Sequence, residues 1–266
     1  MSNGLRELAK IVIFGVGNGG GNALFNIAEK PIPGIDYIAI NTEKASLERI
    51  KTRCQTFQIG EKLTRGFGVG NNAELARKIA VESEHEIQAY MENADIVIVV
   101  ASLGGGTGSG AAPVVAGLAK SKGILTISVV SVPFDFEGRM RLTIAQDALN
   151  KICDNSDAYI VISNQLLLNS RTNTANIGFV EAFKIADNVT SDAVNVITDL
   201  IKRPGLINID LNDFRTILKD SGLMLIGIGY GEGDNRAIDA ANQAINSPLL
   251  TYNSIKGAKG MIVNIA

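Results

Sequence analysis

The sequence predicts an α/β fold in which a mostly parallel sheet is covered by helices on both faces. Short β-branched runs recur along the first part of the chain, at residues 10–17, 37–41, 95–102, 124–131 and 158–163. Stretches of helical period lie between these runs, for example at 73–92 and 113–120. A strand that is apolar along its whole length must be buried on both faces, so strands of this kind alternating with helices indicate a parallel sheet.

The second part of the chain predicts one long helix followed by a smaller α/β unit. Apolar residues at spacings of three and four extend from about Ile177 to Lys202, and Pro204-Gly205 ends the pattern. The residues of this stripe are Val180, Phe183, Ala186, Thr190, Val194, Ile197 and Ile201. We expect the smaller unit to contain a strand at 223–230, a helix at 236–245 and a second strand at 259–265.

Composition excludes several classes of function. The 266 residues have a net charge of −2, which does not suggest a nucleic-acid-binding surface. The chain has no N-terminal apolar signal and no apolar run of 18 residues, so we expect a cytoplasmic protein with no direct membrane contact. Cys54 and Cys153 form no CxxC pair, and His85 lies among glutamates, so we expect no protein-held metal ion.

Two glycine-rich loops predict a phosphate site. "GVGNGGGNA" (15–23) and "SLGGGTGSG" (102–110) each follow a predicted strand, and the second leads into a helix with Pro113 in its first turns, where proline is favoured. Ligands of open α/β sheets bind beyond the carboxyl ends of the strands. Glycine N–H groups and helix N-termini at that edge suit a di- or triphosphate, whereas a merely flexible glycine loop fits this placement poorly.

Motif spacing alone leaves more than one kind of phosphate ligand open. GxxxxGK[ST] is absent, which excludes a P-loop, whereas Gly15, Gly17 and Gly20 match the weak dinucleotide pattern GxGxxG. Asn41, with Glu43 two residues on, occupies the position where a ribose-binding acid would follow the second strand. A dinucleotide-dependent oxidoreductase is therefore an alternative, but it has no need of a second glycine loop. The YxxxK spacing within 252–256 lies in a loop-like stretch and is treated as coincidence.

Several segments together resemble the tubulin/FtsZ family. "GGGTGSG" (104–110) resembles the phosphate-loop motif of that family, and "GVGNGGGNA" resembles the first loop of FtsZ. Further FtsZ-like segments follow in order: "PFDFEGRMR" (133–141), "NQLL" (164–167), "RPGLINIDLNDFRTIL" (203–218) and "SPLL" (247–250). The resemblance covers essentially the whole chain. It implies a GTP-binding domain (1–176), a central helix (177–203), a catalytic loop with its following helix (204–220) and a partial C-terminal domain (221–266).

The resemblance also implies a function. It points to a GTPase that assembles head-to-tail into filaments with copies of itself and acts at the division site of bacterial cells. GTP and GDP would be the nucleotides, with Mg²⁺ neutralising the phosphates. The implied nucleotide-binding residues are Asn18, Gly19, Gly20, Gly21 and Asn22 in the first loop, Gly70 and Asn71 in a γ-phosphate loop, Gly104, Gly105, Gly106, Thr107 and Gly108 in the phosphate loop, Glu137 and Arg141 beside the ribose, and Asn164, Phe183 and Asp187 around guanine.

Some of these residues have a simpler structural explanation. Glu137 and Arg141 are four residues apart and could form an ordinary surface salt bridge. Phe183 fits the apolar stripe of the long helix, so from the helix pattern alone a core position is the better interpretation. In the FtsZ interpretation, Phe183 and Asp187 share one helix face, where the ring stacks on a base and the carboxylate accepts from guanine N1 and N2.

The segment "NIDLND" (208–213) contains the expected catalytic residues. In the FtsZ pattern this loop enters the pocket of the next subunit, where Asn208, Asp210 and Asp213 position and polarise the attacking water. One heterologous contact then repeats along an open filament. The alternative is that an aspartate here simply caps the following helix.

The sequence departs from the FtsZ pattern at several points. Asn18 replaces a glycine, Glu43 stands where aspartate is usual, and Ala73 replaces a proline. The match ends at Ala266, after two strands of the second domain, so we expect an incomplete, aggregation-prone second domain and no recruitment of division partners through a tail peptide. A nucleotide-binding module with impaired polymerisation and hydrolysis is therefore the alternative to a polymerising GTPase.

Overall fold

The computed structural model describes residues 9–169, 178–202, 211–246 and 255–265. Its centre is a seven-stranded sheet of order β3-β2-β1-β4-β5-β6-β7, in which every neighbouring pair is parallel. The strands are β1 (Ile11–Val16), β2 (Ile35–Asn41), β3 (Gln55–Gln58), β4 (Ile96–Ser102), β5 (Leu125–Val132), β6 (Ala158–Ser163) and β7 (Gly222–Leu223). The five strands predicted in the first part of the chain are confirmed, β3 is an addition, and β7 overlaps the predicted strand 223–230 at Leu223.

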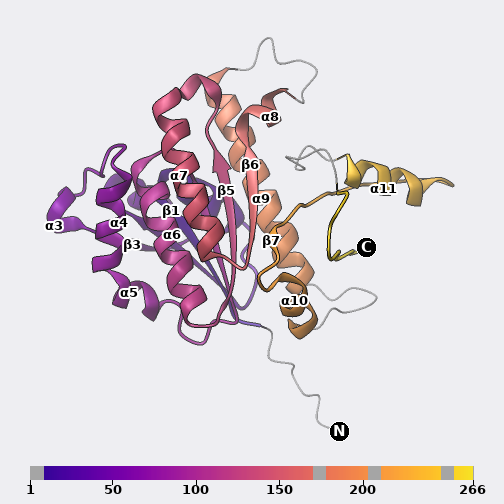
Figure 1. Ribbon diagram of the computed structural model, residues 1–266, viewed down its shortest axis with the longest axis horizontal. Helices are drawn as coiled ribbons and strands as arrows, with labels where there is room; N and C mark the ends of the chain where they lie inside the picture. Colours follow the sequence, from indigo (N-terminus) through magenta and orange to yellow (C-terminus); the bar gives the residue numbers. More distant parts are fainter. Residues whose placement is uncertain (1–8, 170–177, 203–210, 247–254, 266) are drawn as a thin grey trace, which may run out of the picture.

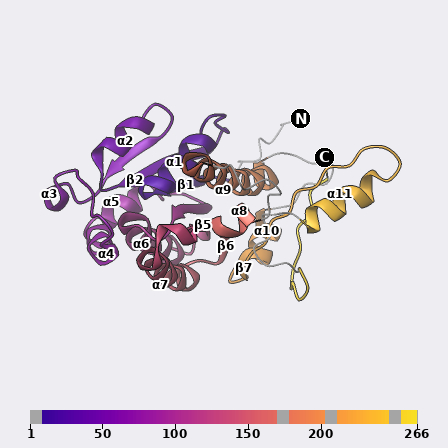
Figure 2. The same ribbon diagram turned by 90° about the horizontal axis from the view of Figure 1, so that it is seen from above.

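Helices cover both faces of the sheet, as Figure 2 shows from above. One face is packed by α1 (Gly17–Ile27), α2 (Lys44–Ile50), α9 (Phe179–Lys202) and α10 (Leu211–Leu218). The other face is packed by α4 (Ala73–Glu82), α5 (Glu84–Ala89), α6 (Gly106–Ser121) and α7 (Arg139–Asn155). Short elements complete the connections: α3 (Glu61–Thr64), η1 (Asp135–Glu137) and α8 (Asn164–Asn169).

The strands divide their side chains between two separate cores. In β1, Ile11 and Ile13 join the core under α1 and α9, whereas Val12 and Phe14 join the core under α6. Successive strand residues point to opposite faces, so a strand between two helical layers must be apolar at every position. All six residues of β1 are buried. This explains why the continuous apolar runs of the sequence predicted a doubly covered sheet.

The long helix is confirmed as α9, but its apolar stripe is not buried along its whole length. Ala186, Thr190 and Val194 are buried, Ala186 against Phe134 and Val194 in the core under α1 and α9. Phe183 and Val180, one and two turns nearer the N-terminus, are 40% and 71% exposed. The core interpretation of Phe183 is therefore wrong, because at the start of α9 it is the neighbouring Ala182 that faces the core and packs on Phe134.

Two smaller helix predictions need correction. The helical stretch 73–92 is divided at Ser83, whose hydroxyl donates to the carbonyl of Ile79 and which separates α4 from α5. Pro113 lies inside α6 and not in its first turns, because the helix already begins at Gly106. Proline at this position has no N–H to donate to the carbonyl of Ser109.

The end of the chain departs most from the prediction. The helix at 236–245 is confirmed as α11 (Arg236–Ile245), but among the described residues only Leu223 of the two predicted strands lies in a strand, β7, which pairs with β6; the amide of Met224 adds one more bond, to the carbonyl of Tyr159. Met224 and Ile226 pack on the core under α1 and α9, and beyond them the chain lies against α11, where a Cβ on Gly227 or Gly229 would meet helix carbonyl oxygens within 2.0 Å. Both strand predictions are therefore wrong beyond Leu223, because strand-prone residues need a neighbouring strand with which to exchange hydrogen bonds.

In the described part of the chain, no helix combines the length and apolarity that a membrane crossing needs.

Candidate nucleotide site

The two glycine-rich loops meet where β1 and β4 end side by side. A Cβ on Gly20 would lie 2.3 Å from the carbonyl oxygen of Val100, and one on Gly17 would lie 2.8 Å from the amide nitrogen of Gly108. Real Cβ atoms do not approach backbone this closely, so any side chain would separate the two loops. Gly17 also has a φ of +74°, which favours glycine. Glycine is therefore required for the first turn of α1 to sit directly on the end of β4.

The phosphate loop is held equally tightly from its other sides. The amide of Gly106 donates to the carbonyl of Gly70 at 3.1 Å, which joins this loop to the segment 68–72. A Cβ on Gly104 would meet Pro133 at 2.5 Å and the carbonyl of Arg141 at 3.1 Å. In contrast, a Cβ on Gly105 would have no atom within 4 Å. Gly105 thus faces open space in the middle of an otherwise closely packed surface.

Two helix N-termini open onto this surface without a side-chain cap. Helix α1 begins after Val16 and α6 begins after Gly105, and neither flanking residue supplies a capping side chain. Neither helix has an acidic residue in its first turn. The first N–H groups of a helix need acceptors, and the helix dipole makes this end positive. Two such ends side by side, with glycine in front of them, form an anion site suited to several phosphate oxygens.

A polar network fixes the first loop to the end of β2. The Asn41 side chain donates to Oδ1 of Asn18 at 2.6 Å, and the Asn18 side chain donates to Oε2 of Glu43 at 2.8 Å. Hydrogen bonds from Ser46 and Asn18 lower the pKa of the Glu43 carboxyl. Asn41 and Glu43 are therefore engaged in holding the loop, which disfavours the ribose-binding role that a dinucleotide site would give them. The network also accommodates Asn18, the side chain that replaces a glycine of the FtsZ pattern.

The sequence analysis missed Thr42, which lies beside the phosphate loop. Its hydroxyl is 2.8 Å from the hydroxyl of Thr107, and the Thr42 residue is fully buried. The signal that could have identified it is its position directly after β2, at the same edge of the sheet as both glycine loops. Thr42 fixes the orientation of the Thr107 hydroxyl toward the site.

Of the predicted guanine residues, Asp187 lies beside the first loop. Asn22 of α1 hydrogen-bonds to the carboxylate of Asp187 of α9, and burial raises the pKa of Asp187 from 3.8 to about 6. Asn164, at the start of α8, is buried, and its side-chain oxygen has no hydrogen-bond partner in the described part of the molecule. The charged form of the Asp187 carboxylate is disfavoured by burial, and the buried amide oxygen of Asn164 has no described partner. Both groups favour a ligand that brings hydrogen-bond donors.

Glu137 and Arg141 form the ion pair that the simpler explanation predicts. Their side chains meet at 2.6 Å, and Glu137 also accepts from the amide of Phe134 at 2.9 Å, which closes the η1 turn. The pair lies next to the phosphate loop through the contact of Arg141 with Gly104. A ribose-side role remains a prediction.

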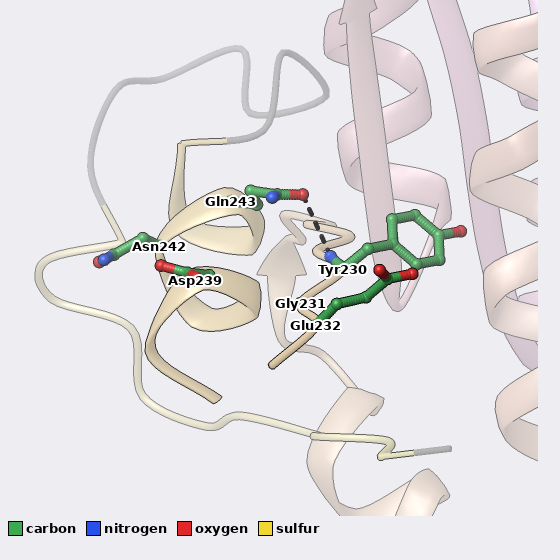
Figure 3. A pocket seen from close by; sticks show the side chains of 6 residues that line it. All are labelled: Tyr230, Gly231, Glu232, Asp239, Asn242 and Gln243. Atoms are coloured by element: carbon green, nitrogen blue, oxygen red, sulfur yellow. Dashed lines mark hydrogen bonds between the residues drawn. The ribbon is translucent and has the colours of Figure 1, made fainter. Parts of the chain in front are cut away.

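Two hollows of the described surface lie elsewhere. One of about 680 Å³ lies between α4, α6 and α7, and one of about 480 Å³ lies between residues 230–232 and α11. Figure 3 shows the second, where the amide of Tyr230 donates to Gln243 at 3.1 Å and Glu232 and Asp239 contribute acidic groups. Acidic lining opposes phosphate binding, so size alone does not identify the nucleotide site.

The expected catalytic residues are only partly described. Asn208 and Asp210 lie outside the described residues. Asp213 is exposed and is the third residue of α10, so it lies in the first turn of the helix. From the same helix, Arg215 donates to the carbonyl of Asp95, just before β4 begins. Asp213 therefore lies at the amino edge of the sheet, opposite the glycine loops, and Figure 1 shows α10 and α8 toward opposite ends of α9.

Comparison with known proteins agrees with this arrangement. The model of the Tubulin/FtsZ family, GTPase domain, matches residues 10–172, and the model of the FtsZ family, C-terminal domain, matches residues 222–266. The cell division protein FtsZ of Pseudomonas aeruginosa is 41% identical over 98% of this chain and 66% of its own length. Cell division protein FtsZ 1 of Thermococcus kodakarensis is 43% identical over 97% of this chain and 68% of its own length.

Solved structures agree as well. An empty FtsZ dimer from M. jannaschii matches with a TM-score of 0.85 and 40% identity, over 91% of this chain and 69% of that chain. A GTPγS-bound protofilament of CetZ2 from Haloferax volcanii matches with a TM-score of 0.74 and 26% identity, over 90% of this chain and 71% of that chain. The chain spans about two thirds of the length of the curated relatives it matches.

The parallel sheet, the paired glycine loops and the match over residues 10–172 define a GTPase domain of the tubulin/FtsZ class. Within this class, the chain belongs to the FtsZ family.

The raised pKa of Asp187 makes stability depend on pH. Because the folded pKa of about 6 lies above the ordinary 3.8, the folded state holds the proton more tightly, and the free energy of unfolding falls as pH rises between these values. Asp187→Asn should therefore stabilise the nucleotide-free protein at pH 7.5 by on the order of 1–3 kcal/mol. Denaturant unfolding at pH 7.5 and pH 4 should show the larger gain at pH 7.5; an equal gain at both would contradict the assignment.

Proposed function

We propose that the chain binds GTP at the joined ends of β1 and β4 and hydrolyses it to GDP and phosphate. The observation that carries this proposal is the pair of uncapped helix N-termini that glycine packing brings side by side, next to the Asn22–Asp187 pair. The first feature suits phosphates, and the second suits a base with adjacent donors. Their proximity supports a nucleotide over inorganic phosphate.

The phosphates would lie over Gly105, where the surface is open. The N–H groups at the starts of α1 and α6 would donate to phosphate oxygens, with the Thr107 hydroxyl as an additional donor. Gly19, Gly20 and Gly21 would allow close approach from one side, and Gly70 and Asn71 from the γ-phosphate side. Each of these groups is neutral, so the positive helix ends would be the protein's contribution to balancing phosphate charge.

Mg²⁺ would accompany the nucleotide. Among the described residues no three acidic, histidine or cysteine groups gather into a metal-binding set, whereas the hydroxyls of Thr42 and Thr107 lie together beside the phosphate surface. Mg²⁺ commonly binds through substrate phosphates and water with few protein ligands. These hydroxyls fit an ion carried by GTP, which when bound would neutralise phosphate charge.

The base would lie between Phe183 and the polar pair from α1 and α9. Ionised Asp187 would accept from guanine N1 and N2, a pair of adjacent donors that adenine lacks. Asn22 would be free to turn toward the base once the ligand replaces its bond to Asp187. A guanine would therefore relieve the burial of a charge that the empty site leaves poorly solvated.

Hydrolysis would need two copies of the chain. Asp187 precedes the end of α9 at Lys202 by 15 residues, which at 1.5 Å per residue is about 22 Å, and Asp213 lies beyond that end, in α10. One molecule cannot bring both carboxylates to one nucleotide, so Asp213, with Asn208 and Asp210, would act on the GTP of a neighbour. The related CetZ2 structure described as a GTPγS-bound protofilament supports such head-to-tail contacts.

The cellular role that follows is assembly into cytoplasmic filaments at the site of cell division. The FtsZ relatives, named as cell division proteins, support this role. The alternative is a GTP-binding module with weak polymerisation and hydrolysis, which the strand-prone segments at 225–230 and 259–265 favour, because within the described residues neither forms a strand. The dependence of GTP turnover on protein concentration separates the two.

Base recognition gives a direct test of the site. GTP should bind at least tenfold more tightly than ATP, because each polar group left unpaired costs about 1–3 kcal/mol. Asp187→Asn should remove most of this preference and improve binding of xanthosine triphosphate, whose C2 carbonyl suits the new amide. Competition binding with the three nucleotides measures this. Equal wild-type affinity for GTP and ATP would contradict the guanine site.

Asp213→Ala should leave GTP affinity nearly unchanged and remove most turnover, because a water-positioning carboxylate acts mainly in the transition state. Wild-type turnover per chain should also rise with protein concentration. Phosphate release and GTP binding, measured over a range of concentrations, test both expectations. Asp213→Asn is the matched control for side-chain size, and it should also be slow because it lacks the charge.

Mixing two inactive variants tests action between chains. Gly105→Val should block phosphate binding while the chain folds, because its Cβ would enter open space and its backbone is extended. Mixed with Asp213→Ala, it should restore part of the turnover, since one variant supplies the pocket and the other the carboxylate. Turnover that does not depend on concentration, together with no recovery on mixing, would leave Asp213 without a role between subunits.

A further inference from the structure

Four phenylalanine rings form one group beside the predicted base site. The rings of Phe134 and Phe136 are stacked, with centroids 4.8 Å apart and planes within 12° of each other. Both lie perpendicular to the Phe183 ring, at 88° with centroids 5.3 Å apart and at 90° with centroids 6.2 Å apart. Phe179 closes the outer side of Phe136 at 5.0 Å. We refer to these four residues as the aromatic group.

The stacked pair is built into the molecule at its inner end. Phe134 is 1% exposed and packs in a small core with Ala182 and Ala186 of α9. The η1 turn that contains the pair is closed by the carboxylate of Glu137, which accepts from the Phe134 amide and pairs with Arg141. The backbone turn and the buried ring therefore fix the position of Phe136, although Phe136 itself is 46% exposed.

The stacked pair restricts Phe183 in turn. Phe183 is 40% exposed and precedes Asp187 by one helical turn, so the two side chains share a face of α9. An exposed phenylalanine on a helix samples several ring orientations, and a ligand that needs one of them must order the side chain on binding. Two rings packed perpendicular to Phe183 hold one orientation before any ligand arrives.

We propose that Phe136, supported by Phe134, is a positioning residue that holds the Phe183 ring ready to stack on the base of the bound nucleotide. This inference rests on the proposed function and adds the residues that preorganise its base site. Phe136 acts through Phe183 and has no assigned contact with the nucleotide. The expected contribution is that of an aromatic pair, about threefold to tenfold in affinity.

Substitution of the exposed ring provides the test, because its loss need not disturb the core. Phe136→Leu should weaken GTP binding about threefold to tenfold and leave the affinity for inorganic tripolyphosphate unchanged, since the latter has no base. Phe136→Tyr keeps the ring and should retain wild-type affinity for both. Met140→Leu, at a 66% exposed site just after the turn, is the matched control and should also bind as the wild type does. Isothermal titration calorimetry measures all four proteins.

A second measurement needs no nucleotide. The chain has no tryptophan, so Phe183→Trp introduces a single indole reporter. Adding Phe136→Leu should lower the fluorescence anisotropy of that indole in the empty protein, whereas adding Met140→Leu should not. Unchanged anisotropy, or equal losses of GTP and tripolyphosphate affinity in Phe136→Leu, would overturn the positioning role. A wild-type protein that binds tripolyphosphate but gains nothing from guanosine would instead contradict the proposed function.

Discussion

The close approach of two backbones at the carboxyl ends of β1 and β4 is the constraint on which the site depends. Gly20 lies against the carbonyl of Val100, and Gly17 lies against the amide of Gly108, at distances that leave no room for a Cβ. This contact is possible because β1 and β4 are neighbours in the sheet, although 79 residues of chain lie between the end of β1 and the start of β4. It sets α1 and α6 side by side with their N-termini uncapped, and it leaves Gly105 facing open space. At the starts of α1 and α6, no side chain caps the helix. A bound phosphate would accept the hydrogen bonds that such caps would otherwise accept.

An energetic cost is also present where the base of the nucleotide is predicted to bind, because a charged group is partly buried there. Burial raises the pKa of Asp187, and one bond from Asn22 offsets that burial only in part. Asn164 adds a buried oxygen without a described partner. The empty site thus holds groups that are less stable than they would be in water, and donors on a ligand would remove that instability. The stacked Phe134–Phe136 pair differs in kind, because it orders Phe183 through apolar contact and needs no ligand to be satisfied.

Local patterns in the sequence predicted the central sheet but not its margins. The β-branched runs identified β1, β2, β4, β5 and β6, because strands buried on both faces must be apolar throughout. They missed β3, whose sequence QTFQ is short, polar and at an edge, and they overextended the strands after Leu223, where pairing depends on a neighbouring strand. The glycine loops predict a phosphate surface because their spacing is local. The exposure of Phe183 and the contact of Thr42 with Thr107 depend on how distant elements pack, which periodicity does not encode.

The location of the nucleotide is the central claim, and backbone amide resonances test it most directly. In a titration of the isotopically labelled protein with a non-hydrolysable GTP analogue, the amides of residues 17–22 and 105–108 should shift most, together with those around Asp187. Tripolyphosphate should shift the two glycine loops but leave the surroundings of Asp187 and Phe183 nearly unchanged. Shifts confined to the hollow between α4, α6 and α7, or to residues 230–243, would contradict the account, because they would place the ligand away from the joined helix N-termini.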